Sequence, residues 1–284
     1  MFKIVMDGAG DMPPEWQTEY GIDVIPINIH FGEQTYLQNV DLSSEAFYRL
    51  ADQGREHPKT SQPSPHQFVT FYRSIAQRGE QILSIHVTRK LSGTLASAQL
   101  AAQELAGEIE IIPFDSGVGS AGIGFLCREA RLLERSGATI EQILQRLNEL
   151  RSQIQITLTL DTLEYARRSG RVKTLQAALA SLLNVKPVVV LREGALEMAG
   201  RVRTRKRALE HIVEMMRERM QARLVNVAIV HARDQSTAQD LLAQVKQALN
   251  CHETFIAELS ISVAANLGPG TVGIVAYPVK DGIR

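Results

Sequence analysis

The first half of the chain alternates short apolar runs with longer segments of helical periodicity. The apolar runs predict buried strands at residues 2–6, 22–31, 82–87 and 109–114. Pro26 interrupts the second run, so that strand is expected at a sheet edge or a bend. Helices are predicted at residues 44–51, 66–77, 94–106, 118–135 and 140–150, and the last of these has a clear amphipathic pattern. This alternation is typical of a mostly parallel sheet flanked by helices.

Polar residues at the segment starts support several of these helices. Ser43 is a candidate N-cap for the helix that follows it. Ser64 is a second candidate N-cap, and Pro65 then occupies the first helical position. The polar stretch Thr60-Ser61-Gln62-Pro63 before it is interpreted as a loop.

The second half has a less regular order of elements. Strands are predicted at 154–160, 185–191, 195–202, 226–231, 255–259 and 272–276, and the second and third of these form a hairpin around Arg192-Glu193-Gly194. Helices are predicted at 161–169, 175–183, 205–220 and 238–249. We therefore expect an α/β protein of two domains: an N-terminal domain, 1–150, with a mostly parallel sheet, and a mixed α/β C-terminal domain, 151–284.

Composition excludes several classes of protein. Of the 284 residues, 44% are hydrophobic and 22% charged, so the chain is expected to fold rather than remain disordered. Cations and anions number 31 each, which argues against duplex DNA as the main partner. The two cysteines, Cys127 and Cys251, have no metal-ligand spacing, and no zinc or other metal site is expected. We find neither a secretory leader nor a membrane-spanning run, and we expect a cytoplasmic protein.

A glycine-rich turn and three acids are the first candidates for chemistry. Residues 117–122 fit the pattern G-x-G-x-x-G, but two helices follow where a dinucleotide site needs a second strand. Asp7, Asp115 and Asp161 each follow a predicted strand, where acids act in catalysis or bond the local loop. An enzyme that uses Asp115 and Ser116 on an acyl or phosphorylated small molecule is therefore one alternative.

Hydroxyl-rich turns are the second candidates. Leu91-Ser92-Gly93-Thr94 places a hydroxyl at a helix start, and helix N-termini offer free N–H groups to anions. Thr60 and Ser61 supply two more hydroxyls from the same half of the chain. In a parallel sheet both loops can emerge at the carboxyl edge. Ser92 is either an anion-binding residue or a plain N-cap.

Together these motifs resemble the DegV family. Thr60-Ser61-Gln62-Pro63-Ser64-Pro65, Leu91-Ser92-Gly93-Thr94, Asp115-Ser116, Ser169-Gly170-Arg171-Val172 and Gly268-Pro269-Gly270 occur in that family's order along essentially the whole chain. The family consists of fatty-acid-binding proteins, some of which are acyl-carrying subunits of bacterial fatty acid kinase. The resemblance implies a two-domain α/β protein that buries a long acyl chain, such as that of palmitate, in a tunnel of the N-terminal domain.

The resemblance also implies roles for single residues. Thr60 and Ser92 would bond the carboxylate, with Ser61 and Gly93 close behind them. Arg171 would organise this network. Asn266 stands where the family often has histidine, and it cannot become cationic near neutral pH. The implied protein is not itself an enzyme and needs no cofactor besides the bound fatty acid.

A basic cluster lies at a predicted strand-to-helix corner. Its members are Arg201, Arg203, Arg205, Lys206 and Arg207. A solvated basic patch is one interpretation. Docking of an acidic partner through Arg201, Arg203, Arg205 and Lys206 is another, and the resemblance implies that this partner is the kinase subunit. A nucleic-acid or regulatory binding module using the same corner is a further alternative.

Overall fold

A computed structural model describes residues 2–54, 56–173 and 185–279. The chain divides into two compact units, Met1–Arg151 with Ser260–Ala265, and Ser152–Leu259 with Asn266–Arg284. We call them unit 1 and unit 2 and describe each by itself. The predicted helix at 175–183 lies outside the described residues.

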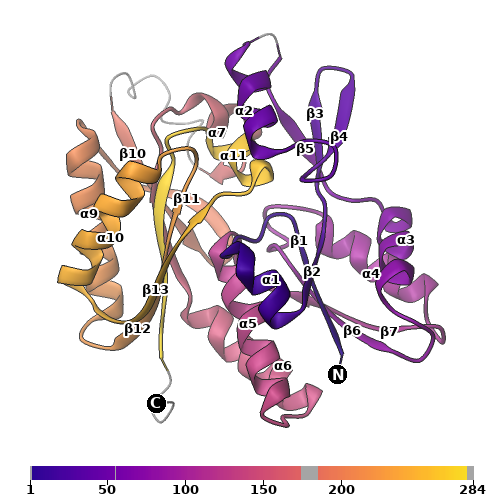
Figure 1. Cartoon of the computed structure of the whole chain (residues 1–284). Helices are drawn as coiled ribbons and strands as arrows, with labels where there is room; N and C mark the ends of the chain where they lie inside the picture. The colour runs from indigo at the N-terminus through magenta and orange to yellow at the C-terminus, as the bar shows by residue number, and fades with distance from the viewer. Residues whose placement is uncertain (1, 55, 174–184, 280–284) are drawn as a thin grey trace. The chain divides into compact units, whose positions relative to one another are not determined.

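Unit 1 contains a parallel sheet, a small antiparallel sheet and the helices that cover them (Figure 1). Its strands are β1 (Lys3–Asp7), β2 (Ile22–Ile25), β3 (Asn28–Phe31), β4 (Gln34–Leu37), β5 (Lys59–Ser61), β6 (Gln81–His86) and β7 (Glu110–Asp115). Its helices are α1 (Pro14–Tyr20), α2 (Ser44–Asp52), α3 (Pro65–Ile75), α4 (Thr94–Glu104), α5 (Ala121–Arg135) and α6 (Ile140–Gln153), which runs two residues into unit 2.

The parallel sheet has the order β2-β1-β6-β7 and buries both of its faces. Val5 and Ile82 pack against α3 and α4 in one hydrophobic core of aliphatic and aromatic side chains. Met6 points to the other face, where Gly10 and Ile123 of α5 approach it. Strands covered on both faces read as the continuous apolar runs seen in the sequence. The predicted parallel sheet flanked by helices is therefore confirmed.

Residues 22–31, predicted as one strand, form two strands in two different sheets. Asp7 of β1 pairs with Ile25, whereas Asn28 pairs with Ser61 in the sheet β4-β3-β5. Pro26 lies between them and has no N–H to continue a ladder. Thr60 and Ser61, predicted to lie in a loop, belong to the strand β5 of this small sheet.

The N-terminal ends of two unit 1 helices follow the prediction. Ser43 accepts a bond from Ala46 N and caps α2. Ser64 and Gln67 form a reciprocal capping box at the start of α3, with Pro65 at the first helical position.

Unit 2 contains a mixed sheet of order β13-β12-β14-β8-β10-β11-β9. Its strands are β8 (Gln155–Thr159), β9 (Val172–Lys173), β10 (Lys186–Arg192), β11 (Ala195–Val202), β12 (Leu224–His231), β13 (Asn250–Glu258) and β14 (Val272–Pro278). Its helices are α7 (Glu164–Ser169), α9 (Arg205–Met220), α10 (Gln235–Ala248) and α11 (Ile261–Leu267), whose first five residues belong to unit 1. The predicted hairpin is the antiparallel pair β10–β11, and the mixed α/β class is confirmed.

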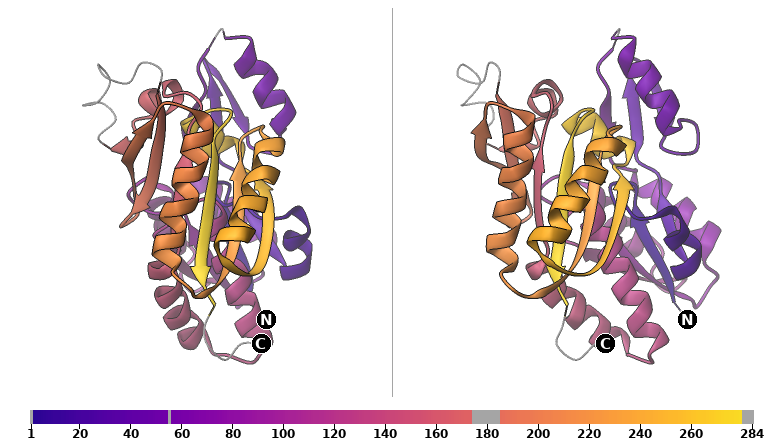
Figure 2. Two further views of the ribbon diagram at one scale, coloured as in Figure 1. Left: turned by 90° about the vertical axis from the view of Figure 1, so that its left-hand side faces the viewer. Right: turned by 60° about the vertical axis from the view of Figure 1, so that its left-hand side comes forward.

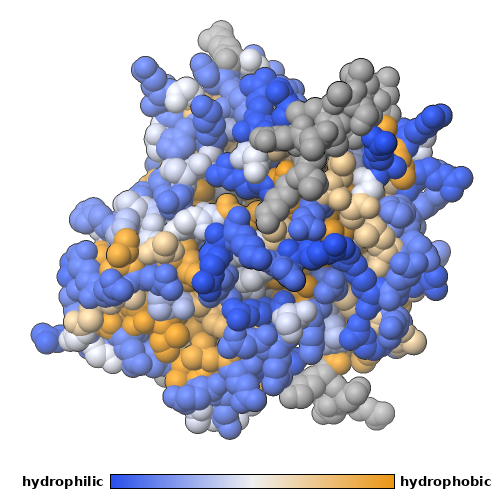
Figure 3. Space-filling view, turned by 180° about the vertical axis from the view of Figure 1, so that it is seen from behind, coloured by the Kyte–Doolittle hydropathy of each residue, from blue (hydrophilic) through white to orange (hydrophobic). Residues whose placement is uncertain are grey.

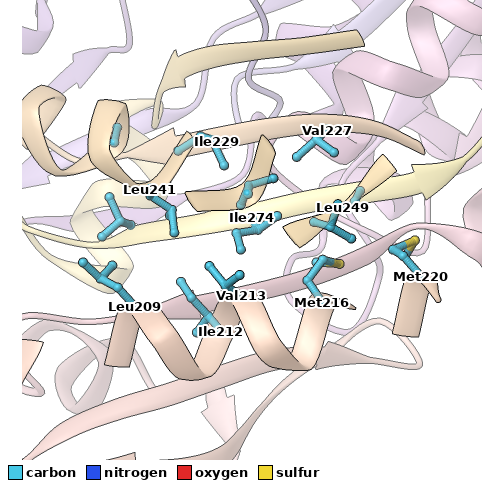
Figure 4. Packing of buried hydrophobic residues seen from close by; sticks show 14 of the residues in the cluster. Leu209, Ile212, Val213, Met216, Met220, Val227, Ile229, Leu241, Leu249 and Ile274 are labelled. Atoms are coloured by element: carbon cyan, nitrogen blue, oxygen red, sulfur yellow. The ribbon is translucent and has the colours of Figure 1, made fainter. Parts of the chain in front are cut away.

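Helices α9 and α10 lie against the same face of this sheet (Figure 2). Their apolar sides interdigitate with side chains of β12 and β14, as Figure 4 shows for Ile212, Leu241 and Ile274. Helix α7 begins at Glu164 rather than at Asp161, because Asp161 bonds Lys186 and Thr162 accepts from Glu164 N.

Two threonines of β8 interrupt this aliphatic core. Thr157 and Thr159 are fully buried, and neither hydroxyl has a hydrogen-bond partner among the described residues. Ile274 lies opposite Thr157 in the neighbouring strand, so the hydroxyl faces an apolar neighbour. A buried hydroxyl without a partner costs about 1–3 kcal/mol.

We expect Thr157→Val, which keeps the shape and removes the hydroxyl, to raise the free energy of unfolding by about 1 kcal/mol. Urea unfolding measures the change. Thr254→Val on the half-buried strand β13 is the control and should change stability much less. A loss of stability in Thr157→Val would contradict the expectation.

The surface of the described residues is mainly polar. The large hydrophobic side chains that are exposed, Val40, Leu100, Leu132 and Leu224, come from separate segments. Figure 3 shows on one face that apolar areas are divided by hydrophilic residues. None of the described helices has the length and apolarity that crossing a membrane requires. Across the same residues, no group of three His, Cys, Asp or Glu side chains is arranged to hold a metal.

Candidate functional site

The small sheet places Thr60 and Ser61 on opposite faces. Thr60 lies opposite Ile29, and Ser61 lies opposite Asn28. Because successive side chains of a strand alternate, Thr60 shares a face with the fully buried Ile29. On this face, which we call the inner face, Phe31 contacts Phe47 of α2, with 5.7 Å between ring centroids. Thr60 is thus the hydroxyl directed toward the interior of unit 1.

Ser61 belongs to a polar network on the outer face. Its hydroxyl lies 2.8 Å from His30 Nε2, and His30 Nδ1 lies 2.9 Å from Thr35 Oγ1. Asn28 Nδ2 donates to the Gln62 carbonyl at 3.1 Å. This network holds β5 in register with β3. The structure therefore gives the Ser61 hydroxyl a partner on the face away from Thr60.

The two hydroxyl motifs meet through Gln62 and Gly93. A Cβ atom on Gly93 would lie 2.8 Å from Gln62 Nε2, so the amide rests on the bare backbone of the glycine. Only glycine accepts such an approach without displacing the neighbour. The loop that bears Ser92 and the segment that bears Thr60 are therefore in contact, although Thr60 lies in the antiparallel sheet β4-β3-β5 and not in a loop at the carboxyl edge of the parallel sheet.

Ser92 and Gly93 form the start of α4. Gly93 is the N-cap, so Ser92 precedes the cap rather than forming it. The Ser92 hydroxyl lies 2.8 Å from Thr94 Oγ1 and accepts weakly from Thr94 N at 3.3 Å. All three residues are at least partly buried. The N-terminus of α4 thus presents hydroxyls and amides beside Gln62.

A buried polar chain supports this edge of the sheet. The Asp7 carboxylate accepts from Val87 N at 2.8 Å, from Ala9 N at 2.9 Å and from His86 Nδ1 at 3.2 Å. Because a carboxylate only accepts here, His86 carries its proton on Nδ1, and Nε2 accepts from Ser84 at 2.8 Å. The fourth member is Tyr72, which donates to Ser84 at 2.8 Å.

All four of these side chains are fully buried. Burial raises the pKa of the Tyr72 phenol well above its ordinary value, so Tyr72 stays a neutral donor. The chain runs from α3 to the ends of β1 and β6, which adjoin the Ser92 loop. Sequence reasoning identified Asp7 only as a strand-end acid and missed the rest of the chain, because His86 and Ser84 come from β6 and Tyr72 comes from α3.

Gln38 is a second residue that sequence reasoning missed. It follows β4, and its backbone N donates to Ile27 O at 3.0 Å, which places its side chain on the inner face with Ile29 and Thr60. Its Nε2 donates to Gly8 O at 2.8 Å, and only 4% of the residue is exposed. Gly8 leaves room for this amide, which a Cβ would touch at 2.9 Å.

The residues of the enzyme alternative have hydrogen-bond partners in their own turn and, for Asp115, also in Arg89. Asp115 Oδ1 accepts from Gly117 N at 3.0 Å, and Oδ2 accepts from Arg89 at 2.6 Å. Ser116 is buried and donates to Val118 O at 3.0 Å. In the glycine-rich turn that follows, Ser120 has a φ of +53° and its hydroxyl bonds Asp11. These contacts stabilise the connection from β7 to α5.

Two predicted site residues, Arg171 and Asn266, belong to unit 2. Arg171 Nη1 donates to Ser169 O at 2.6 Å, just after α7. Asn266 lies in α11, which leads into the loop Gly268-Pro269-Gly270. This loop packs on the α7 region: a Cβ on Gly268 would lie 2.9 Å from the Tyr165 ring. The Arg171 and glycine-proline motifs are thus neighbours through α7.

The structure separates the basic cluster into two kinds of residue. Arg205 is half-buried, pairs with Asp234 at 3.0 Å and donates to Gly270 O, so it braces the glycine-proline loop. By contrast, Arg201, Arg203 and Lys206 are exposed. The Arg205 side chain is therefore engaged inside unit 2, and the exposed members are those that a partner can reach.

Comparisons with known proteins agree along the whole chain. The family model described as "Uncharacterised protein, DegV family" matches residues 1–279. A DegV domain-containing protein of Deinococcus radiodurans is 33% identical over 281 residues, which cover 98% of each chain.

Solved structures agree in fold. A DegV family protein from Thermus thermophilus, described for its fatty acid binding, superposes with a TM-score of 0.88 at 32% identity and covers 98% of this chain and 99% of that chain. DegV of Bacillus subtilis, described as a fatty acid binding protein, has a TM-score of 0.86 at 27% identity with the same coverage. The chain therefore belongs to the DegV family.

Proposed function

We propose that this protein binds a long-chain fatty acid, with the carboxyl group at the edge formed by Thr60, Gln62, Ser92 and Gly93. The observation that carries the proposal is the contact between Gln62 and Gly93, which joins the two hydroxyl motifs. Fatty acid binding by the Thermus and Bacillus relatives supports the same ligand class.

From this edge, the acyl tail would run between helices α3 and α4 and the parallel sheet. Helices α3 and α4 both begin beside it and run along the parallel sheet. Between them and the sheet lies an aliphatic and aromatic core that includes Val5, Phe68, Ile82 and Ala98. We propose that the tail enters a tunnel through this core. Each methylene that leaves water contributes about 0.8 kcal/mol, so roughly fifteen of them dominate the affinity.

We further propose that the protein presents the carboxyl group to a kinase subunit and catalyses nothing itself. The exposed cations Arg201, Arg203 and Lys206 are the proposed docking residues for an acidic partner surface. For Arg171 and Asn266, a part in binding the head group stays the expectation that the resemblance to the DegV family implies. The enzyme alternative is less well supported, because Asp115 is bonded to Gly117 and Arg89, and Ser116 is bonded to Val118.

Recovery of a ligand tests the proposal. Native mass spectrometry of the purified protein, followed by solvent extraction, should yield one C14–C18 fatty acid per chain. A fluorescent fatty acid should bind the delipidated protein and be displaced by palmitate. If no acid is extracted and the titration shows no binding, the proposed function is wrong.

A further inference from the structure

The Gln38 amide has one polar atom satisfied and one not. Its Nε2 donates to Gly8 O, while its Oε1 is buried and receives no hydrogen bond from the described residues. The orientation follows from chemistry, because a carbonyl oxygen such as that of Gly8 requires a donor opposite it. Oε1 is therefore a buried hydrogen-bond acceptor, and buried acceptors are normally paired with a donor.

Gln38 lies over the same sheet edge as the proposed head-group site. Gln38 is on the inner face of the small sheet, as Thr60 is. Gln38 follows directly after β4, and Gln62 follows directly after β5 in the same way. Gln38 rests on Gly8 after β1, and Gln62 rests on Gly93 after β6. Since β1 and β6 are neighbours, the two amides cover adjacent strand ends.

The groups on this face carry no charge. Thr60, Gln62 and Ser92 offer neutral donors, and Gln38 Oε1 offers only lone pairs. A carboxylate would find no cation among them, and one of its oxygens would be repelled by Oε1. A neutral carboxylic acid has the complementary set of one O–H donor and one carbonyl acceptor.

On the inner face, the Tyr36 hydroxyl donates to Gln34. The following charged side chains of the surrounding unit 1 elements are bonded to other groups or lie away from this face. Asp7 is bonded to His86 and two amides, Asp41 accepts from Leu37 N, and Arg89 pairs with Asp115. His30 and Lys59 lie on the outer face, and Lys90 is exposed on the loop before Ser92.

We propose that the fatty acid is held as the neutral acid, with its O–H donating to Gln38 Oε1 and its carbonyl accepting from Thr60 and Ser92. This inference rests on the proposed function. An acid ionised in water takes up one proton from solvent as it binds. Any transfer of phosphate to the carboxyl group would first require that proton to leave, so the protonated complex is a storage form.

Proton uptake is the first test. A carboxylic acid in water ionises near pH 4.3, and binding of the neutral form raises the pKa of the bound group. Between the free and the bound pKa, the affinity therefore falls as pH rises, by up to tenfold per unit. Calorimetry of palmitate binding in two buffers of different ionisation enthalpy should show uptake of about one proton at pH 7. Uptake of none would overturn the inference.

A matched ligand pair is the second test. Hexadecanol has an O–H donor, and its methyl ether has the same chain without one. Wild-type protein should prefer the alcohol by about tenfold, the cost of leaving one buried acceptor unpaired. Gln38→Leu should remove this preference, and Gln34→Leu, an exposed position on β4, should keep it.

The outcomes separate this inference from the proposed function. Equal binding of alcohol and ether by the wild-type protein, with tight palmitate binding, overturns the neutral-acid inference alone. If palmitate, alcohol and ether all fail to bind, both proposals fall. If Gln38→Leu does not fold, proton uptake by the wild-type protein and its preference for the alcohol over the ether still test the inference.

Discussion

Asp7→Ala should lower the free energy of unfolding by about 3–5 kcal/mol, because it leaves three buried hydrogen-bond donors without an acceptor, each at a cost of about 1–3 kcal/mol. The substitution leaves His86 Nδ1 and the amides of Ala9 and Val87 without an acceptor in a fully buried place. Such unpaired donors lose the interaction and still pay for desolvation. Urea unfolding at neutral pH measures the effect.

Two variants define the range of this experiment. Asp7→Asn keeps the shape and one acceptor oxygen but turns an amide N–H₂ toward donors, so its loss should be smaller than that of alanine. Asp240→Ala, at an exposed position of α10, should change stability by less than about 0.5 kcal/mol. A loss below 1 kcal/mol for Asp7→Ala would show that the polar chain contributes little to unit 1.

The second large effect is on ligand affinity. Thr60→Ala and Ser92→Ala should each weaken binding of palmitate by about 1–3 kcal/mol, roughly 5- to 150-fold, because each removes one hydroxyl partner from a buried head group. The two hydroxyls share one ligand group, so the double variant should lose less than the sum of the single losses. Displacement of a fluorescent fatty acid measures all three affinities.

Controls separate binding from folding in these variants. Thr70→Ala, at an exposed position of α3, should bind palmitate as tightly as the wild type. Because the Ser92 hydroxyl also contacts Thr94, the thermal midpoint of Ser92→Ala should be compared with that of the wild type. Unchanged affinity in both single variants would contradict the head-group roles of Thr60 and Ser92.

The sequence predicted most of the regular elements because their signals are local. Helix α9 covers residues 205–220, as its periodicity indicated, and the caps Ser43 and Ser64 form as expected. Short elements were missed where the local signal is weak. The strand β5 has three residues, and its hydrogen bonds go to β3, some thirty residues earlier in the chain.

Within the candidate site, the sequence predicted which residues take part but not the direction in which their side chains point. Thr60 and Ser61 are adjacent hydroxyl residues, and only the register with Ile29 and Asn28 assigns them to opposite faces. Arg205 reads as one of five similar cations until Asp234 and Gly270, each distant in sequence, accept its bonds. Pairing with a distant strand or loop is invisible to local patterns.

By itself, the sequence determined the α/β class, the alternation of elements and the two hydroxyl motifs, because periodicity, caps and turn residues act over a few neighbouring positions. The tertiary structure alone decided that Gln62 meets Gly93, that Gln38 covers Gly8, and that Asp7, His86, Ser84 and Tyr72 form one buried chain. These contacts join residues from separate elements. They exist only because sheet packing excludes water and leaves each buried polar group to find its partner across the fold.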